Sequence, residues 1–257
     1  MKYEEGKARK KYRYKLTGNM RNRLTIIMLL IPALFTVLPI VLLLTGSVMD
    51  QYELKGYLNS IFTDGLEFIS WKLMPDYPTF ENYGRLLFVS PQFFVLFWNS
   101  IKMTAWILSG QLLVGVPAAW AFAVYKVRGS RFLFAFYVVL MLLPFQVTML
   151  SSYLMLDKLS LLNTQSAVIL PAVFSTFPVF LCYGGFRSIP AQLYEAARID
   201  GAGEGFIFFK IGLPLGKNGI LSALVLGFLE YWNMMEQPMA FLEEKALWPL
   251  SLYLPEI

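Results

Sequence analysis

The chain of 257 residues has no histidine and a single cysteine, Cys182. Histidine is the most frequent acid–base group and metal ligand near neutral pH, and a lone cysteine cannot form a disulfide within its own chain. The sequence therefore argues against histidine-based catalysis, against metal clusters and against a disulfide scaffold. It leaves the redox compartment open.

Charge is scarce as well. Charged residues make up 15% of the chain and hydrophobic residues 57%, whereas an average soluble domain has about 25% charged residues. This composition is typical of an integral membrane protein. Because helices satisfy their own backbone hydrogen bonds in lipid, we expect an all-α polytopic helical bundle.

Five apolar runs are long enough to cross about 30 Å of hydrocarbon, which takes about 20 helical residues. The first run is too long for a signal-peptide core and should stay as an anchor. Prolines at 32, 39, 117, 144, 171 and 178 predict kinked helices. The five predicted spans are Leu24–Thr45, Ile101–Tyr125, Phe132–Leu156, Ala167–Phe186 and Asn218–Met235.

The positions of lysine and arginine predict the orientation. Residues 1–23 hold nine of them, residues 126–131 hold three and residues 187–217 hold four, so 16 of 22 lie on alternate loops. By the positive-inside rule these segments face the cytoplasm, and residues 46–100 and 236–257 lie mostly outside. The basic tail sets topology and touches anionic lipid, each cation contributing about 1 kcal/mol. No folded nucleic-acid-binding module accompanies it.

The cytoplasmic loop at residues 187–217 mixes acids, bases and glycines. Ser188 can cap a short helix that carries Pro190 in its first turn. Gly201 can end this helix in the left-handed conformation, which glycine adopts without strain. A second short helix, residues 206–211, should follow before the next span begins.

One face of the first loop helix is shallow, and Glu195 and Arg198 lie beside it. Such a face lets another protein approach closely, whereas the alternative is an amphipathic loop that lies at the membrane surface without a partner. The residues of this face are spaced i, i+3, i+4 and i+7: Leu193, Ala196, Ala197 and Asp200.

The loop also matches the longer pattern E-A-A-x3-G-x9-I-x-L-P. At about 7% per residue type, the seven fixed positions coincide by chance on the order of once in 10⁸ starting points. The fixed positions are Glu195, Ala196, Ala197, Gly201, Ile211, Leu213 and Pro214.

Stretches outside the loop extend the similarity: "NSIKMTAWILSGQLLVGVPAAWAFAVYKVRG" from Asn99, "LLNTQSAVILP" from Leu161, "FRSIPAQLYEAARIDGA" from Phe186 and "LEYWN" from Leu229. With them, the chain resembles the maltose-type carbohydrate permeases of ATP-binding-cassette importers. The resemblance implies the type I importer permease fold and a multi-pass place in the bacterial cell membrane, with the amino terminus in the cytoplasm. A sixth span follows an "LWPLSLYL"-like stretch in related permeases, so we expect one span to be missing here.

The resemblance also implies partners. A sister permease subunit would share the pathway, two cytosolic ATPase subunits would drive it, and an extracytoplasmic binding protein would deliver a carbohydrate. The loop would dock on the ATPase through the seven pattern residues together with Arg198 and Asp200. No cofactor is expected in this chain, because the partner ATPase would bind ATP and magnesium.

The chain should not be an enzyme. Its nearest approach to a phosphate loop, "GLPLGKN" from Gly212, has three spacer residues where the motif needs four, and Asn in place of Ser or Thr. A secondary transporter would need inverted repeats and more buried ionisable groups. An intramembrane enzyme would need a nucleophile–base set. The sequence offers neither set of features.

Ionisable residues inside spans mark pathways or subunit contacts, because burying a charge in lipid is costly. Glu230 lies past the midplane of the last predicted span and, with Trp232 and Asn233, could line a sugar site. The alternative is that Glu230 pairs with a group on the sister permease. Lys102, near the outer end of its span, is expected to snorkel to the surface.

Overall fold

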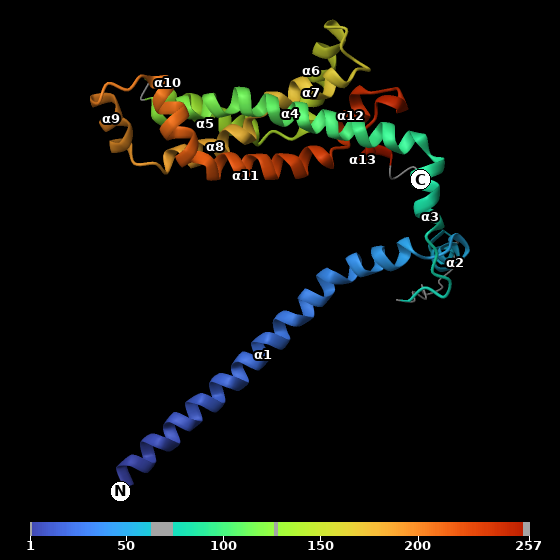
Figure 1. Cartoon of the computed structure of the whole chain (residues 1–257), viewed down its shortest axis with the longest axis vertical. Helices are drawn as coiled ribbons and strands as arrows, with labels where there is room; N and C mark the ends of the chain where they lie inside the picture. The colour runs from blue at the N-terminus through green and yellow to red at the C-terminus, as the bar shows by residue number, and fades with distance from the viewer. Residues whose placement is uncertain (1, 63–73, 126–127, 254–257) are drawn as a thin grey trace. The chain divides into compact units, whose positions relative to one another are not determined.

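The computed structural model describes residues 2–62, 74–125 and 128–253 (Figure 1). Side chains are not described for residues 2–22, 24 and 58–62. The predicted lipid contact of the basic tail therefore lies outside the described side chains, and so do parts of the predicted outer segments. The chain divides into two units, Met1–Val89 and Ser90–Ile257, and each is described by itself.

Unit 1 consists of one long helix followed by a short folded segment. Within the long helix, residues 25–47 are apolar enough to span a membrane. The Glu53 carboxylate accepts hydrogen bonds from the backbone N–H groups of Asp76 at 2.9 Å and Tyr77 at 3.2 Å. These bonds connect the segment around residue 76 with the helix that contains Glu53. The elements are α1 Lys2–Ser47, α2 Gln51–Phe62, α3 Glu81–Gly84 and the π-helix η1 Arg85–Val89.

Unit 2 is a bundle in which α4, α8 and α11 lie side by side (Figure 1). We call the end that carries α9 the loop end, and the end that carries α13 the far end. The elements are α4 Pro91–Val124, α5 Ser130–Met141, α6 Phe145–Lys158, α7 Gln165–Val173, α8 Thr176–Arg187, α9 Ala191–Ile199, α10 Glu204–Phe206, the π-helix η2 Ile207–Gly212, α11 Leu213–Trp232, α12 Glu236–Phe241, the 3₁₀-helix η3 Lys245–Leu247 and α13 Leu250–Tyr253.

Four of the five predicted spans are helices long and apolar enough to cross a membrane: Thr25–Ser47, Pro91–Val124, Gln165–Arg187 and Glu204–Trp232. The second begins ten residues earlier than predicted, at Pro91 rather than Ile101. The all-α character is confirmed, because the described residues contain helices and a single isolated bridge between strand-like residues.

The third predicted span, Phe132–Leu156, corresponds to two helices with a sharp bend between them, either a broken span or a re-entrant loop. The helices α5 and α6 meet at an angle of 96° across the break at residues 142–144. Pro144 cannot donate a backbone hydrogen bond, which favours a break at this point. Beyond it, α6 turns towards α12: the Phe145 and Phe241 rings lie 6.0 Å apart, and the Gln146 amide donates to the Glu236 carboxylate at 3.1 Å.

Glycines bring α8 and α11 into backbone contact. A Cβ placed on Gly185 would lie 2.9 Å from the Gly219 Cα and 3.0 Å from the Gly216 carbonyl oxygen. No side chain fits at that crossing. Small residues of this kind let helices pack closely in lipid, where the hydrophobic effect does not drive their association.

Candidate functional site

The loop helix α9 begins at Ala191, with Pro190 at its N-cap position. The predicted cap by Ser188 is wrong. Ser188 is the C-cap residue of α8, and its hydroxyl donates to the Gly185 carbonyl oxygen at 2.7 Å. The proline keeps the chain extended between the two helices, so the serine belongs to the preceding turn.

Gly201 ends α9 in the left-handed conformation, with φ of +84°, which confirms this part of the prediction. The Ala202 N–H donates to the Ala197 carbonyl oxygen at 2.9 Å, and the Gly201 N–H donates to that of Arg198 at 3.1 Å. These two bonds satisfy carbonyl groups that the helix end would leave free. The turn therefore depends on a residue that tolerates positive φ.

The predicted separate helix at residues 206–211 is not separate. The elements α10, η2 and α11 follow one another without a break, so a single helical stretch runs from Glu204 to Trp232. Pro214 lies in the first turn of α11. The π-helix before it has a wider hydrogen-bond spacing, which accommodates the missing proline donor.

The small face of α9 is open. Leu193 is 46% exposed, Ala196 and Asp200 are also exposed, and Ala197 is half-buried. Tyr194 points the other way and is 5% exposed, so it fastens α9 to the bundle. One side of the helix is thus anchored, while the side with the alanines is free to meet a partner.

Arg198 pairs across the turn rather than along the helix. Its Nε donates to the Glu204 carboxylate at 2.7 Å, and the hydrogen bond raises the pKa of the guanidinium. The Tyr125 hydroxyl donates to the same carboxylate at 3.0 Å. Burial and this carboxylate raise the pKa of Tyr125. Glu204 therefore links α9 with the end of α4, a role that the sequence pattern did not indicate.

Trp120 on α4 joins the loop to the bundle. Its ring meets those of Phe186 on α8, Tyr194 on α9 and Phe208 on η2 edge-on, with centroids 5.3, 5.1 and 5.4 Å apart. The ring also covers Gly212, where a Cβ would collide with it. Trp120 is 4% exposed. The sequence analysis did not single it out.

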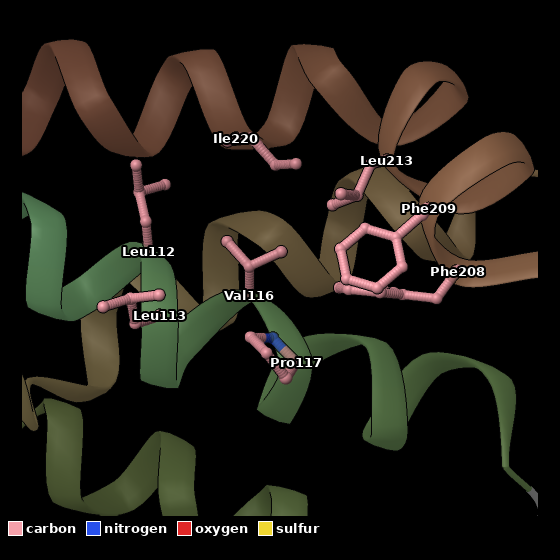
Figure 2. Close-up of a pocket in the computed structure, with 8 residues that line it drawn as sticks. All are labelled: Leu112, Leu113, Val116, Pro117, Phe208, Phe209, Leu213 and Ile220. Carbon is pink, nitrogen blue, oxygen red and sulfur yellow. The ribbon is translucent and has the colours of Figure 1, made fainter. Parts of the chain in front are cut away.

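An apolar pocket of about 390 Å³ lies beside this cluster. Figure 2 shows side chains from α4 facing Phe208, Phe209 and residues of α11 across it. Sugar hydroxyls need hydrogen-bond partners, and this lining supplies none, so the pocket is unsuited to a carbohydrate. Its lining residues are Leu112, Leu113, Val116, Pro117, Phe208, Phe209, Leu213 and Ile220.

The far end is held by amide groups instead. The Asn99 Nδ2 donates to the carbonyl oxygens of Ala246 at 2.7 Å and Trp248 at 3.1 Å, and its Oδ1 accepts the Gln165 Nε2 at 2.9 Å. The Ser100 hydroxyl accepts the Leu250 N–H at 2.8 Å. These bonds fix the segment after α12 against α4 and α7.

Gln111 makes a second polar contact in the middle of α4. Its Nε2 donates to the Ala172 carbonyl oxygen and to the Tyr231 hydroxyl, both at 2.8 Å. Gln111 is neutral, so it does not stand out among the ionisable residues of the spans. An amide within an otherwise apolar run is the signal that would have found it.

The three candidate pathway residues do not form one cluster. Glu230 is exposed on α11. Trp232 packs against Phe97, with ring centroids 6.0 Å apart. The Asn233 amide donates to the Leu229 carbonyl oxygen at 2.8 Å, which closes the end of its own helix. Lys102 is exposed on α4, as snorkelling requires.

The model of the family described as "Binding-protein-dependent transport system inner membrane component" matches residues 111–235. The match runs from Gln111 to just beyond α11 and includes Trp120 and the whole loop. The diacetylchitobiose uptake system permease protein NgcG of Streptomyces coelicolor is 32% identical over 215 residues, covering 82% of this chain and 70% of the relative. The chain belongs to this family.

The arabinooligosaccharides transport system permease protein AraQ of Halalkalibacterium halodurans is 32% identical over 178 residues, covering 69% of this chain. The match spans 64% of that relative's length. A crystal structure of a bacterial ABC transporter involved in the import of the acidic polysaccharide alginate has a TM-score of 0.77 and 26% identity, covering 93% of this chain and 80% of the other.

These likenesses confirm two predictions, the permease family and the type I importer permease fold. The family description names a membrane component of a transport system, which agrees with the prediction that the chain is a transport subunit rather than an enzyme. The role of the loop residues and of Glu230 stays a prediction.

Proposed function

We propose that the chain is the permease subunit of an ATP-driven importer in the bacterial cell membrane. A sister permease completes the pathway, two cytosolic ATPase subunits drive it, and an extracytoplasmic binding protein delivers the substrate. The amino terminus and the loop end face the cytoplasm, in keeping with their excess of lysine and arginine. ATP and magnesium bind to the ATPase, and this chain holds no cofactor.

The loop is the observation that carries the proposal. The exposed face of α9 offers a shallow surface to a partner, while Tyr194 and Trp120 join the same helix to three helices of the bundle. A displacement of α9 is therefore transmitted to the membrane helices through packed aromatic rings rather than through a flexible linker. This is the property that a coupling element needs.

The substrate class is a carbohydrate, either an oligosaccharide or a sugar derivative. The names of the relatives support it, since they include permease proteins of transport systems for arabinooligosaccharides, diacetylchitobiose and galactooligosaccharides. A relative named for sn-glycerol-3-phosphate, from Brucella abortus, is 29% identical, so a phosphorylated polyol is the second candidate. Uptake of labelled sugars and of glycerol phosphate by cells with and without the gene distinguishes the two.

The coupling role is tested by two glycines of the same turn. Gly201 and Gly203 both have open space where a Cβ would stand, but only Gly201 has positive φ. Gly201→Val should abolish uptake, because a β-branched residue resists the left-handed conformation. Gly203→Val should retain most of it. Membrane insertion of each variant is checked by immunoblotting.

Glu195→Lys should also abolish uptake, since it reverses the charge beside the docking face. Glu243→Lys, which reverses an exposed charge at the far end, is the matched control. Normal uptake by both Gly201→Val and Glu195→Lys would refute the coupling role of the loop.

A further inference from the structure

A groove of about 830 Å³ lies at the loop end, next to the ring cluster around Trp120. It lies where α4 and α8 end and α5 begins. Its rim carries Arg128, Arg131 and Arg187, all of them exposed. Among residues 74–125 and 128–253, no carboxylate forms an ion pair with these three arginines. Three unpaired guanidinium groups on one groove favour an anionic ligand.

The inner wall of the groove is aromatic. The Phe134 and Tyr183 ring centroids lie 4.0 Å apart, and Phe122 lies 5.5 Å from Phe134. On the same helix as Phe134, Phe132 is 76% exposed and Phe136 is 55% exposed, so α5 continues the apolar surface beyond the groove. A ligand that fits has a charged head for the rim and an apolar part for the wall.

A buried hydroxyl adds a second, independent sign of a ligand. Tyr194 lines the groove and is 5% exposed, yet its hydroxyl has no hydrogen-bond partner among the described residues. Buried polar groups without partners are rare, because each costs free energy. The hydroxyl is closed to solvent, so a phosphate oxygen in the groove would accept from it only after the Tyr194 ring shifts.

We propose that the groove between α4, α5 and α8 binds the phosphate headgroup of an anionic phospholipid, with the arginines on the phosphate and the aromatic wall against the glycerol and upper acyl chains. Basic pockets between membrane helices on the cytoplasmic side are suited to such headgroups. A free phosphate would leave the aromatic wall unused. The assignment of the site to the cytoplasmic leaflet depends on the orientation given under the proposed function, whereas the site itself does not.

The test uses the full chain in its transporter complex, reconstituted in nanodiscs of phosphatidylcholine with a small fraction of phosphatidylglycerol. Native mass spectrometry counts the phosphatidylglycerol molecules that stay bound after extraction. The double variant Arg128→Gln/Arg187→Gln should lower the affinity for phosphatidylglycerol about tenfold, because two charge-assisted hydrogen bonds are lost. Lys217→Gln is the matched control, since Lys217 is exposed on α11 and does not line the groove.

Tyr194→Phe keeps the ring contacts and removes the hydroxyl, so the affinity should fall about threefold while the complex stays assembled. Retention of phosphatidylglycerol by the double arginine variant at the wild-type level would overturn the proposal, as would an equal loss in Lys217→Gln. Inorganic phosphate that competes as well as the lipid would overturn the lipid assignment. Gly201→Val is expected to lose transport but to retain phosphatidylglycerol, because Gly201 does not line the groove. Its lipid retention therefore tests this proposal independently of the proposed function.

Discussion

The two ends of unit 2 are held together by different interactions. At the loop end, Trp120 contacts the rings of three other elements, and the only side-chain hydrogen bonds described there between α9 and its neighbours are those that meet at the exposed Glu204 carboxylate. At the far end, Asn99 and Ser100 bind backbone groups of the segment after α12 through hydrogen bonds of 2.7–3.1 Å. Aromatic packing predominates at the loop end, and hydrogen bonds to backbone groups predominate at the far end.

This difference has a mechanical consequence. Ring contacts keep much of their energy when the rings slide by a fraction of an ångström, whereas hydrogen bonds weaken steeply when their angle changes. We therefore expect the loop end to shift more readily than the far end. In an importer, the shifting end is the one that should meet the ATPase.

Trp120→Ala gives the largest expected effect. It removes three ring contacts and leaves a void beside Gly212, so the free energy of unfolding should fall by about 3–5 kcal/mol. Sugar uptake and substrate stimulation of the ATPase should both be lost. Trp106→Ala on the same helix is the control: Trp106 is 67% exposed, and its loss should cost about 0.5 kcal/mol or less. Equal destabilisation of the two variants would show that the ring cluster does not hold the loop.

Asn99→Leu tests the far end and should have an intermediate effect. It keeps the branching of the side chain and removes three hydrogen bonds, which should destabilise the protein by about 1–3 kcal/mol. Hydrogen exchange at the Leu250 amide should quicken, while exchange within α9 should not change. Asn218→Leu, at an exposed position on α11, should leave both rates as they are. A faster exchange in α9 alone would contradict the expected difference between the two ends.

Glu230→Gln should have the smallest effect on stability, because the side chain is exposed on α11 and its shape is kept. If Glu230 lines the pathway, the KM for the sugar changes while the complex stays intact. If it pairs with the sister permease, that subunit no longer copurifies. Transport by purified complex in vesicles measures both, with Glu243→Gln as the control. An intact complex with an unchanged KM would reject both roles.

Hydropathy and the E-A-A pattern were enough to predict the family, the fold class, four spans and the left-handed turn at Gly201. Each depends on local composition or on a conformation that one residue type favours. The 96° bend at Pro144 was not predictable to that extent, because the proline fixes only the break. The direction of α6 depends on its contacts with α12, such as the Gln146–Glu236 hydrogen bond, whose partners are 90 residues apart in the chain.

The ring cluster around Trp120 and the amide contacts of Asn99 and Gln111 were not predicted, for a related reason. A tryptophan in an apolar run reads the same whether it faces lipid or three other rings, so nothing in the sequence singled out Trp120. Asn99 and Gln111 carry no charge and were passed over in favour of Glu230. The continuous helix through Pro214 was missed because the accommodating π-helix is not visible in the sequence pattern.

Cross-linking from the exposed face of α9 tests the coupling claim most directly. The native Cys182 is buried, so a cysteine placed at Ala196 is the one reactive thiol exposed among the described residues. In the assembled transporter, Ala196→Cys should cross-link to the ATPase subunit, and Ala246→Cys at the far end should not. Cross-linking at position 246 but not at position 196 would contradict the account.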